Sequence, residues 1–171
     1  MLSVIKWLAL LPFQFASTFA AWIVAPIAVL FRHEYSLKGT WFWWTTTPVT
    51  DLRGDPDHQE KWNHRNCYMQ FVTWIWRNPA VNFQREWLGY SYEVTDEYNQ
   101  HHKQLKNGGI YKRETIYRNG RLRCWMIYLV YVYPFYTKKA FRFLIGWKTW
   151  DVGVKDPLQY TCRITPWKSV D

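Results

Sequence analysis

The fold prediction depends most on the stretch WLALLPFQFASTFAAWIVAPIAVLF, at positions 7–31. It carries no charge, and Gln14, Ser17 and Thr18 are its most polar residues. As an α-helix it would reach roughly 37 Å, which exceeds the ~30 Å hydrocarbon core of a bilayer. The stretch therefore predicts one membrane-spanning helix, with the rest of the chain attached to its C-terminal side.

Three other interpretations of this stretch stay open. It can be a re-entrant or interfacial helix. A cleaved signal peptide would have Lys6 in front and a cut after Ala20, but its apolar run should end after about 7 to 15 residues. A buried helix of a soluble core is the third, although so long a run without a polar face fits lipid better. Pro12 and Pro26 each remove a helix hydrogen bond, which spanning helices tolerate where neighbouring groups replace it.

Composition and charge describe the remainder of the chain. Outside the hydrophobic stretch about 140 residues remain, enough for one domain with its own core. Aromatic residues make up 20% of the chain, with thirteen tryptophans, which is typical of folded sequence. The formal charge is +9, and positions 103–148 hold eleven basic residues against one acidic residue. This half predicts a basic surface that would lie close to anionic headgroups.

Cysteines and flanking charges bear on the compartment. The three cysteines show no paired spacing, which argues against a disulfide framework and is compatible with a reducing compartment. Lys6 precedes the hydrophobic stretch, while Arg32, Lys38 and the basic domain follow it. This balance favours a membrane location with the C-terminal domain in the cytoplasm.

Four consecutive aromatic residues follow the hydrophobic stretch: Trp41, Phe42, Trp43 and Trp44. Such rings gather at the headgroup level of membranes, because they are apolar with a polar edge. The four residues therefore predict a membrane-interface segment. The alternative is that they enter the core of the domain.

The next positions predict a loop and then helices. Proline and glycine break the chain over 45–57. Asp57 and Glu60 have the spacing of a capping box, which predicts a helix over 58–77 that ends before a proline. A shorter helix is predicted over 80–88.

Later positions predict β-strands. Asn119-Gly120 separates two runs rich in β-forming residues, which is a strong hairpin signal. A polar stretch over 96–109 is predicted as a loop. The predicted strands cover 90–94, 110–117, 121–133, 141–148 and 159–165.

The predicted fold class is α+β: an N-terminal transmembrane helix followed by a small domain with an antiparallel β-sheet of four or five strands and one or two helices packed on it. The predicted division has a membrane anchor at 1–33 and an aromatic juxtamembrane segment with an aspartate loop at 34–57. The α+β domain then covers 58–171.

Several short motifs are shared with a known family. They are Thr47-Pro48 followed by Asp51 and Gly54-Asp55, the run Trp76–Ala80 (WRNPA), and Ile145–Lys148 (IGWK). With the hydrophobic N-terminal segment, they make the chain resemble a family of small uncharacterised proteins encoded by tailed bacteriophages. Val49-Thr50 stand where that family usually has further aspartates, which puts a metal role for the loop in doubt. The resemblance implies a phage origin and a host membrane, and it implies no chemistry.

The aspartate loop is the best candidate for chemistry. Asp51, Asp55, Asp57 and His58 offer carboxylates for Mg²⁺ or Ca²⁺ and an imidazole for Zn²⁺ or Mn²⁺. However, the spacing is not that of an EF-hand, and aspartates in turns commonly bond their own backbone. We therefore favour structural roles for these residues, with a divalent metal as the alternative and no other cofactor.

The strand-rich half predicts a basic face among tyrosines and tryptophans. Such a face can bind anionic lipid or an acidic protein, or it can simply be solvated; nucleic acid is the weaker candidate. Its residues are Lys112, Arg113, Arg121, Arg123, Lys138, Lys139 and Arg142.

Together these features predict a single-pass, non-enzymatic phage protein that acts at the host inner membrane through protein or lipid interactions. Its partners would be membrane lipids and a host or phage protein. Two alternatives remain: a membrane-tethered, metal-dependent hydrolase that uses the aspartate loop, and a virion component associated with the envelope during genome entry.

Overall fold

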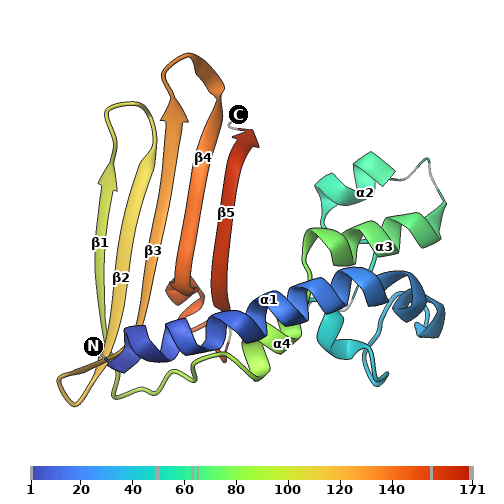
Figure 1. Ribbon diagram of the computed structural model, residues 1–171, viewed down its shortest axis with the longest axis horizontal. Coiled ribbons are helices and arrows are strands. Elements are labelled where there is room, and N and C mark those ends of the chain that lie inside the picture. The colour runs from blue at the N-terminus through green and yellow to red at the C-terminus, as the bar shows by residue number, and fades with distance from the viewer. Residues whose placement is uncertain (1, 49–50, 63, 65, 155, 170–171) are drawn as a thin grey trace. The chain divides into compact units, whose positions relative to one another are not determined.

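The computed structural model describes residues 2–48, 51–62, 64, 66–154 and 156–169 (Figure 1). The chain forms two compact units. The sheet unit spans Met1–Leu11 and Leu88–Asp171, and the helical unit spans Pro12–Trp87. Helix α1 (Leu2–Ala28) contributes its first part to the sheet unit and its remainder to the helical unit. The predicted division into an anchor, an aromatic segment and an α+β domain stays a prediction.

The sheet unit contains five antiparallel strands in the order β1-β2-β3-β4-β5, so that strands adjacent in the chain are adjacent in the sheet. The predicted α+β class, with a long apolar N-terminal helix and an antiparallel sheet, is confirmed. The strands are β1 (Glu97–Gln104), β2 (Ile110–Arg118), β3 (Arg121–Tyr133), β4 (Tyr136–Trp147) and β5 (Tyr160–Ser169). A short 3₁₀ helix, η3 (Thr149–Asp151), follows β4.

The β2–β3 hairpin confirms the prediction from Asn119-Gly120. Both residues have positive φ angles, 53° and 69°. A two-residue turn of this kind matches the right-handed twist of the strands, and Asn and Gly adopt positive φ more readily than other residues. The local sequence therefore sets the register of the two strands, in which Arg118 pairs with Arg121.

Strand β1 corrects two predictions. The loop predicted over 96–109 contains this strand, and the strand predicted over 90–94 is absent apart from an isolated bridge between Tyr90 and Leu158. Almost every β1 side chain is exposed, so neither face of this edge strand is covered along most of its length. Its backbone pairs with β2 along its whole length. A polar edge strand carries no apolar alternation, which is why its sequence reads as a loop.

Trp7 fixes the start of α1 on the sheet. The centroid of its ring lies 5.4 Å from that of Trp125 and 5.8 Å from that of Tyr160. Trp7 Nε1 donates to the Thr161 carbonyl at 3.4 Å, and the Tyr160 hydroxyl donates to the Trp7 carbonyl at 2.7 Å. The first turns of α1 are therefore part of the interior of the sheet unit.

A buried ion pair holds the segment before β1 against β2. The side chain of Asp96 is fully buried, and Arg118 donates to it from Nε at 2.6 Å and from Nη2 at 2.9 Å. The Tyr90 hydroxyl and the Glu93 backbone N–H also donate to this carboxylate, each at 3.0 Å. These hydrogen bonds, those from Arg118 first, lower the pKa of Asp96 to about 2.

We expect Asp96→Asn to reduce the stability of the protein at neutral pH by about 3 kcal/mol, because it breaks a buried pair. The folded-state pKa of Asp96 is about 2, below its ordinary 3.8, so its stabilisation is complete above that ordinary value. It is lost as the pH falls from about 4 to about 2. Urea unfolding at pH 7 and at steps down to pH 2 measures both effects. Glu97→Gln, at an exposed neighbouring carboxyl, is the control; parallel acid dependence of Asp96→Asn and the unmodified protein would contradict the assignment.

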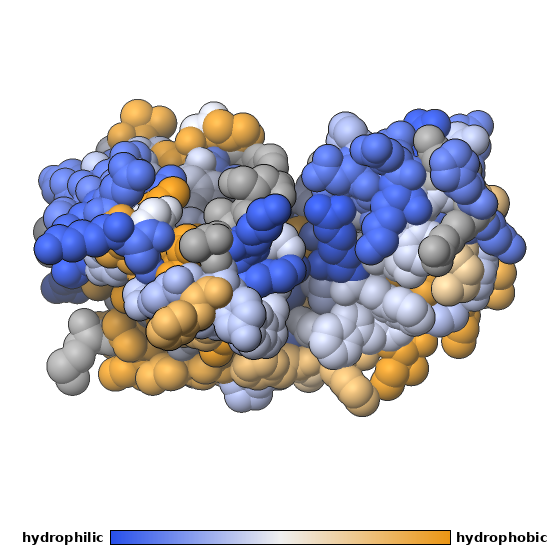
Figure 2. All heavy atoms as spheres, turned by 90° about the horizontal axis from the view of Figure 1, so that it is seen from above, coloured by the Kyte–Doolittle hydropathy of each residue, from blue (hydrophilic) through white to orange (hydrophobic). Residues whose placement is uncertain are grey.

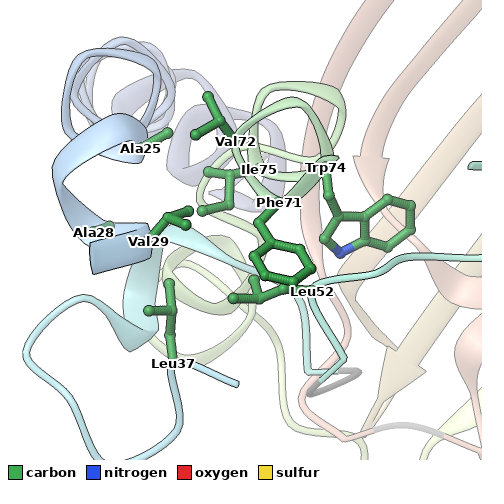
Figure 3. Packing of buried hydrophobic residues seen from close by; sticks show 9 residues of the cluster. All are labelled: Ala25, Ala28, Val29, Leu37, Leu52, Phe71, Val72, Trp74 and Ile75. Carbon is green, nitrogen blue, oxygen red and sulfur yellow. The ribbon is translucent and has the colours of Figure 1, made fainter. Parts of the chain in front are cut away.

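The helical unit has its own hydrophobic core (Figure 3). Residues Ala25, Ala28 and Val29 from α1 and the following 3₁₀ helix η1 (Val29–Phe31) meet side chains of α3 (Cys67–Arg77). The remaining core residues are Leu37, Leu52, Phe71, Val72, Trp74 and Ile75. The unit also contains η2 (Trp43–Thr45), α2 (Pro56–Trp62) and α4 (Val81–Glu86).

The helix predicted over 58–77 is two helices, and Asp57 is not its cap. Helix α2 begins at Pro56, and Asp55 Oδ1 accepts the His58 backbone N–H at 2.9 Å. Proline suits the first helical position, which leaves the preceding aspartate as the cap. Helix α3 starts with its own cap, since Asn66 Oδ1 accepts the Tyr68 backbone N–H at 2.9 Å. The apolar spacing continues through both helices, so periodicity alone did not reveal the break.

Candidate membrane-binding surface

In each unit, the part of α1 that belongs to it has buried positions. The buried positions recur every three, four or seven residues, which places them in one stripe. Apart from Trp7 they are small or polar, whereas a helix of a soluble protein normally buries its large apolar residues. We name this set the inward stripe: Ser3, Trp7, Gln14, Ser17, Ala21, Ala25 and Ala28.

The large apolar residues of α1 and η1 lie on the opposite side, where they are exposed. We name them the outward face: Leu2, Ile5 and Leu8 in the sheet unit, and Phe15, Phe19, Trp22, Ile23, Ile27 and Leu30 in the helical unit. Figure 2 shows hydrophobic residues along one side of the helical unit and hydrophilic residues on the opposite side. Exposed apolar residues gathered in this way mark a surface that meets a partner or a membrane rather than water.

Pro26 is accommodated by a reciprocal pair of tryptophans. Proline has no N–H, so the carbonyl of Trp22, four residues earlier, lacks its helical donor. Trp76 Nε1 donates to that carbonyl at 2.9 Å, and Trp22 Nε1 donates to the Trp76 carbonyl at 3.2 Å. The Tyr68 hydroxyl also donates to the Pro26 carbonyl at 2.9 Å. Protein groups therefore complete the backbone hydrogen bonding of this part of α1.

The two tryptophans also shape a shallow recess on the outward face. Trp22, Ile23 and Trp76 line it, and its volume is about 440 Å³. The indole N–H groups are already bonded to carbonyls, so the rings present apolar surface to the recess.

The four aromatic residues after α1 differ in exposure and do not form one surface. Trp41 is 87% exposed. Phe42 instead packs against the core of the helical unit, with its ring centroid 5.2 Å from that of Phe31. Trp43 is half-buried, and the ring centroid of half-buried Trp44 lies 6.4 Å from that of Phe83. The membrane-interface role of the four residues stays a prediction, for which Trp41 offers the most accessible ring.

The predicted metal residues are engaged elsewhere in the helical unit. Asp51 accepts hydrogen bonds from Arg53 at 2.5–3.0 Å, and these lower the pKa of its carboxyl. Asp55 caps α2 and pairs with Arg77 at 2.9 Å. Asp57 is exposed in the first turn of α2. Within the described ranges, no group of three or more His, Cys, Asp or Glu side chains is arranged to hold a metal.

His58 is close to the aspartates in sequence, but its ring is engaged elsewhere and does not form a metal site with them. Its ring is buried between helices, with its centroid 5.2 Å from that of Trp74. Nε2 lies 3.0 Å from the Gln70 carbonyl oxygen. A carbonyl only accepts, so this nitrogen carries the proton and is not a free metal ligand.

The predicted basic residues are distributed over both faces of the sheet. Directly paired residues share a face and successive residues alternate. The register therefore places Lys112 and Arg142 on one face, and Arg113 and Lys139 on the other. Arg121 and Arg123 lie at the start of β3, and Lys138 lies near the start of β4.

Glu114 is a buried charged residue of the sheet unit to which its local sequence assigns no role. Its side chain is buried, and it accepts hydrogen bonds from the Tyr98 hydroxyl at 2.5 Å and the Thr149 hydroxyl at 2.6 Å. His102 Nε2 lies 2.7 Å from its other oxygen. The only signal in the sequence is that Glu114 is the one acid among the basic residues of 103–148. Because its partners come from β1 and η3, Glu114 ties these elements to β2.

Comparison with known proteins places the whole chain in one family. The model of DUF7338, a family of unknown function, matches residues 1–171, and the chain therefore belongs to this family. No curated protein and no solved structure matches the chain.

Proposed function

We propose that this member of DUF7338 is a membrane-surface protein that binds a bilayer through the outward face of α1. The helix lies in the plane of the membrane, with its inward stripe packed on the protein. The observation that carries this proposal is the division of α1 between large exposed apolar residues and small or polar buried ones.

The length and composition of α1 are also those of a spanning helix. Leu2–Phe31 is long and apolar enough to cross a membrane, which also holds for signal sequences. However, a spanning helix would carry into the hydrocarbon the groups that cover its inward stripe, among them the Thr161 carbonyl and the Tyr160 hydroxyl of a sheet strand. Polar backbone without internal partners is very unfavourable there. An in-plane helix needs only its outward face to enter, by about 5–10 Å.

The resemblance to small proteins of tailed bacteriophages supports the inner membrane of a bacterial host as the target, approached from the cytoplasm. There the protein would act through lipid and protein contacts rather than catalysis. The recess at Trp22 and Trp76 lies on the lipid-facing side and offers a site for an acyl chain.

Labelling from one side of the membrane separates the in-plane helix from a spanning one. Lys6→Cys and Lys38→Cys mark exposed positions in the first turns of α1 and after its end. Each is placed in a Cys67→Ser/Cys162→Ser background, because Cys67 is exposed and Cys162 is half-buried. With a membrane-impermeant maleimide applied to spheroplasts and to lysed cells, we expect both positions to react, or to be protected, together. Reaction of one position in spheroplasts and of the other only after lysis would show a spanning helix and overturn the proposal.

A further inference from the structure

The sheet face that carries the start of α1 continues beyond the helix as an apolar surface. Trp125, against which Trp7 packs, lies on the same face as every second residue of β3. Pairing extends this face across β4 and β5, for example Leu129 with Phe143 and Phe143 with Ile164. We name the following residues the open sheet face: Ile127, Leu129, Tyr131, Phe141, Phe143, Ile145 and Ile164. All are half-buried or exposed.

The opposite face of the sheet carries a second set of buried side chains. Ile116 pairs with Cys124 and Met126 pairs with Gly146, and the side chains of Ile116, Cys124 and Met126 are fully buried. Glu114, on the same face, is bonded to Thr149 of η3. Both faces therefore hold buried side chains, and the open sheet face is the apolar part of its own face that stays accessible beyond the start of α1.

We propose that the open sheet face is a second lipid-contact surface, which rests at the headgroup level of an anionic bilayer. This inference rests on the proposed function of α1. The start of α1 lies on this face, so Leu2, Ile5 and Leu8 project from the same side of the sheet unit. A helix is about 10 Å thick, and an in-plane helix enters the membrane by about 5–10 Å. The sheet face beneath it then lies at the level of the headgroups.

The residues at the far end of this face have the chemistry of that level. The rings of Tyr133 and Tyr136 lie 5.3 Å and 5.9 Å from that of Trp167, and Tyr136 and Trp167 are each 61% exposed. Phe135, in the turn between β3 and β4, is almost completely exposed. Tyrosine and tryptophan are enriched at membrane interfaces because an apolar ring carries a polar group.

The charges on this face also suit anionic lipid. Arg113 lies on it and is exposed, and Lys139 follows by alternation. The positions of β2 to β5 that share this face, among those the structure describes, contain no acidic residue. Basic side chains at the surface of an anionic membrane each add attraction, and acidic ones would oppose it.

The test uses an environment-sensitive dye on single cysteines of the full chain, in a Cys67→Ser/Cys162→Ser background. Ile164→Cys reports on the open sheet face, and Arg163→Cys, the next residue, reports on the opposite face. Phe19→Cys reports on the outward face of α1. Vesicles of pure phosphatidylcholine are compared with an equal mixture of phosphatidylglycerol and phosphatidylcholine. Tyr131→Cys is a second probe of the open sheet face, used if Ile164→Cys alters folding by circular dichroism.

We expect the dye at position 164 to shift to the blue with the mixed vesicles, much less with phosphatidylcholine, and the dye at 163 to stay unchanged. A silent dye at 164 together with a shifted dye at 19 would overturn this inference and leave the proposed function intact. Silence at 19 as well would overturn both. A blue shift at 164 that grows with protein concentration in the absence of vesicles would show that a second copy covers the face, and it would overturn lipid as the occupant.

Discussion

Replacing Phe19 and Ile23 together by glutamate is expected to reduce binding to anionic vesicles by at least about 100-fold. The two side chains are 62% and 60% exposed on the outward face, so neither contributes much to the folded core. Burying a large apolar side chain is worth about 1.5–3 kcal/mol, and each factor of ten in affinity corresponds to about 1.4 kcal/mol. Two lost anchors, replaced by charges that resist leaving water, therefore remove most of the binding energy of a single helix face. The partition coefficient from vesicle flotation measures the loss.

The matched control is Val94→Glu with Val154→Glu. These valines are 98% and 76% exposed in loops of the sheet unit, and the double substitution introduces the same two negative charges. We expect it to change vesicle binding only through net charge, an effect that added salt reduces. Both double variants should retain the circular dichroism spectrum and melting temperature of the unmodified protein. If the control lost binding as completely as Phe19→Glu/Ile23→Glu, the outward face would have no special role.

The parts of the fold that are encoded locally could be predicted from the sequence. Asn119-Gly120 satisfies the positive φ angles of a tight hairpin by itself, and the flanking strands carry enough β-branched and aromatic residues to be recognised. Strand β1 has neither signal. Its polar side chains face solvent, and it exists because its backbone completes the hydrogen bonds of β2. Such pairing between distant positions is not expressed as a local pattern.

The candidate metal site also could not be judged from local sequence, because the partners of its side chains depend on the tertiary fold. Asp51, Asp55 and His58 are close in sequence, which suggested a shared ligand. In the structure each has a different partner, namely Arg53, Arg77 and the Gln70 carbonyl. The last two partners lie twelve or more residues away, and only the tertiary fold of the helical unit brings them near.

The orientation of α1 was present in the sequence but hidden by its average composition. Mean hydropathy over positions 7–31 is high because nearly all of the residues are apolar, which predicts a helix surrounded by lipid. The information lies in the spacing of its weakly apolar residues, since Gln14, Ser17, Ala21, Ala25 and Ala28 recur at intervals of three or four. Small residues at such spacing allow close packing of a helix against its neighbours. This stripe is the signal by which a one-sided helix can be recognised.

Substitutions at two alanines of α1, one on each side of the helix, test whether only one side is packed against protein. Ala25 is fully buried in the core of the helical unit, whereas Ala16 is exposed on the other side of the helix. We expect Ala25→Phe to destabilise the protein by about 3 kcal/mol, because it forces a large ring into a filled core. For a chain of this length that corresponds to a fall of roughly 6–12 °C in melting temperature. Ala16→Phe adds the same ring to the outward side, so it should leave the melting temperature unchanged and strengthen vesicle binding. A helix surrounded by lipid would accept both rings equally, and equal melting temperatures for the two variants would therefore contradict the packing of α1 described above.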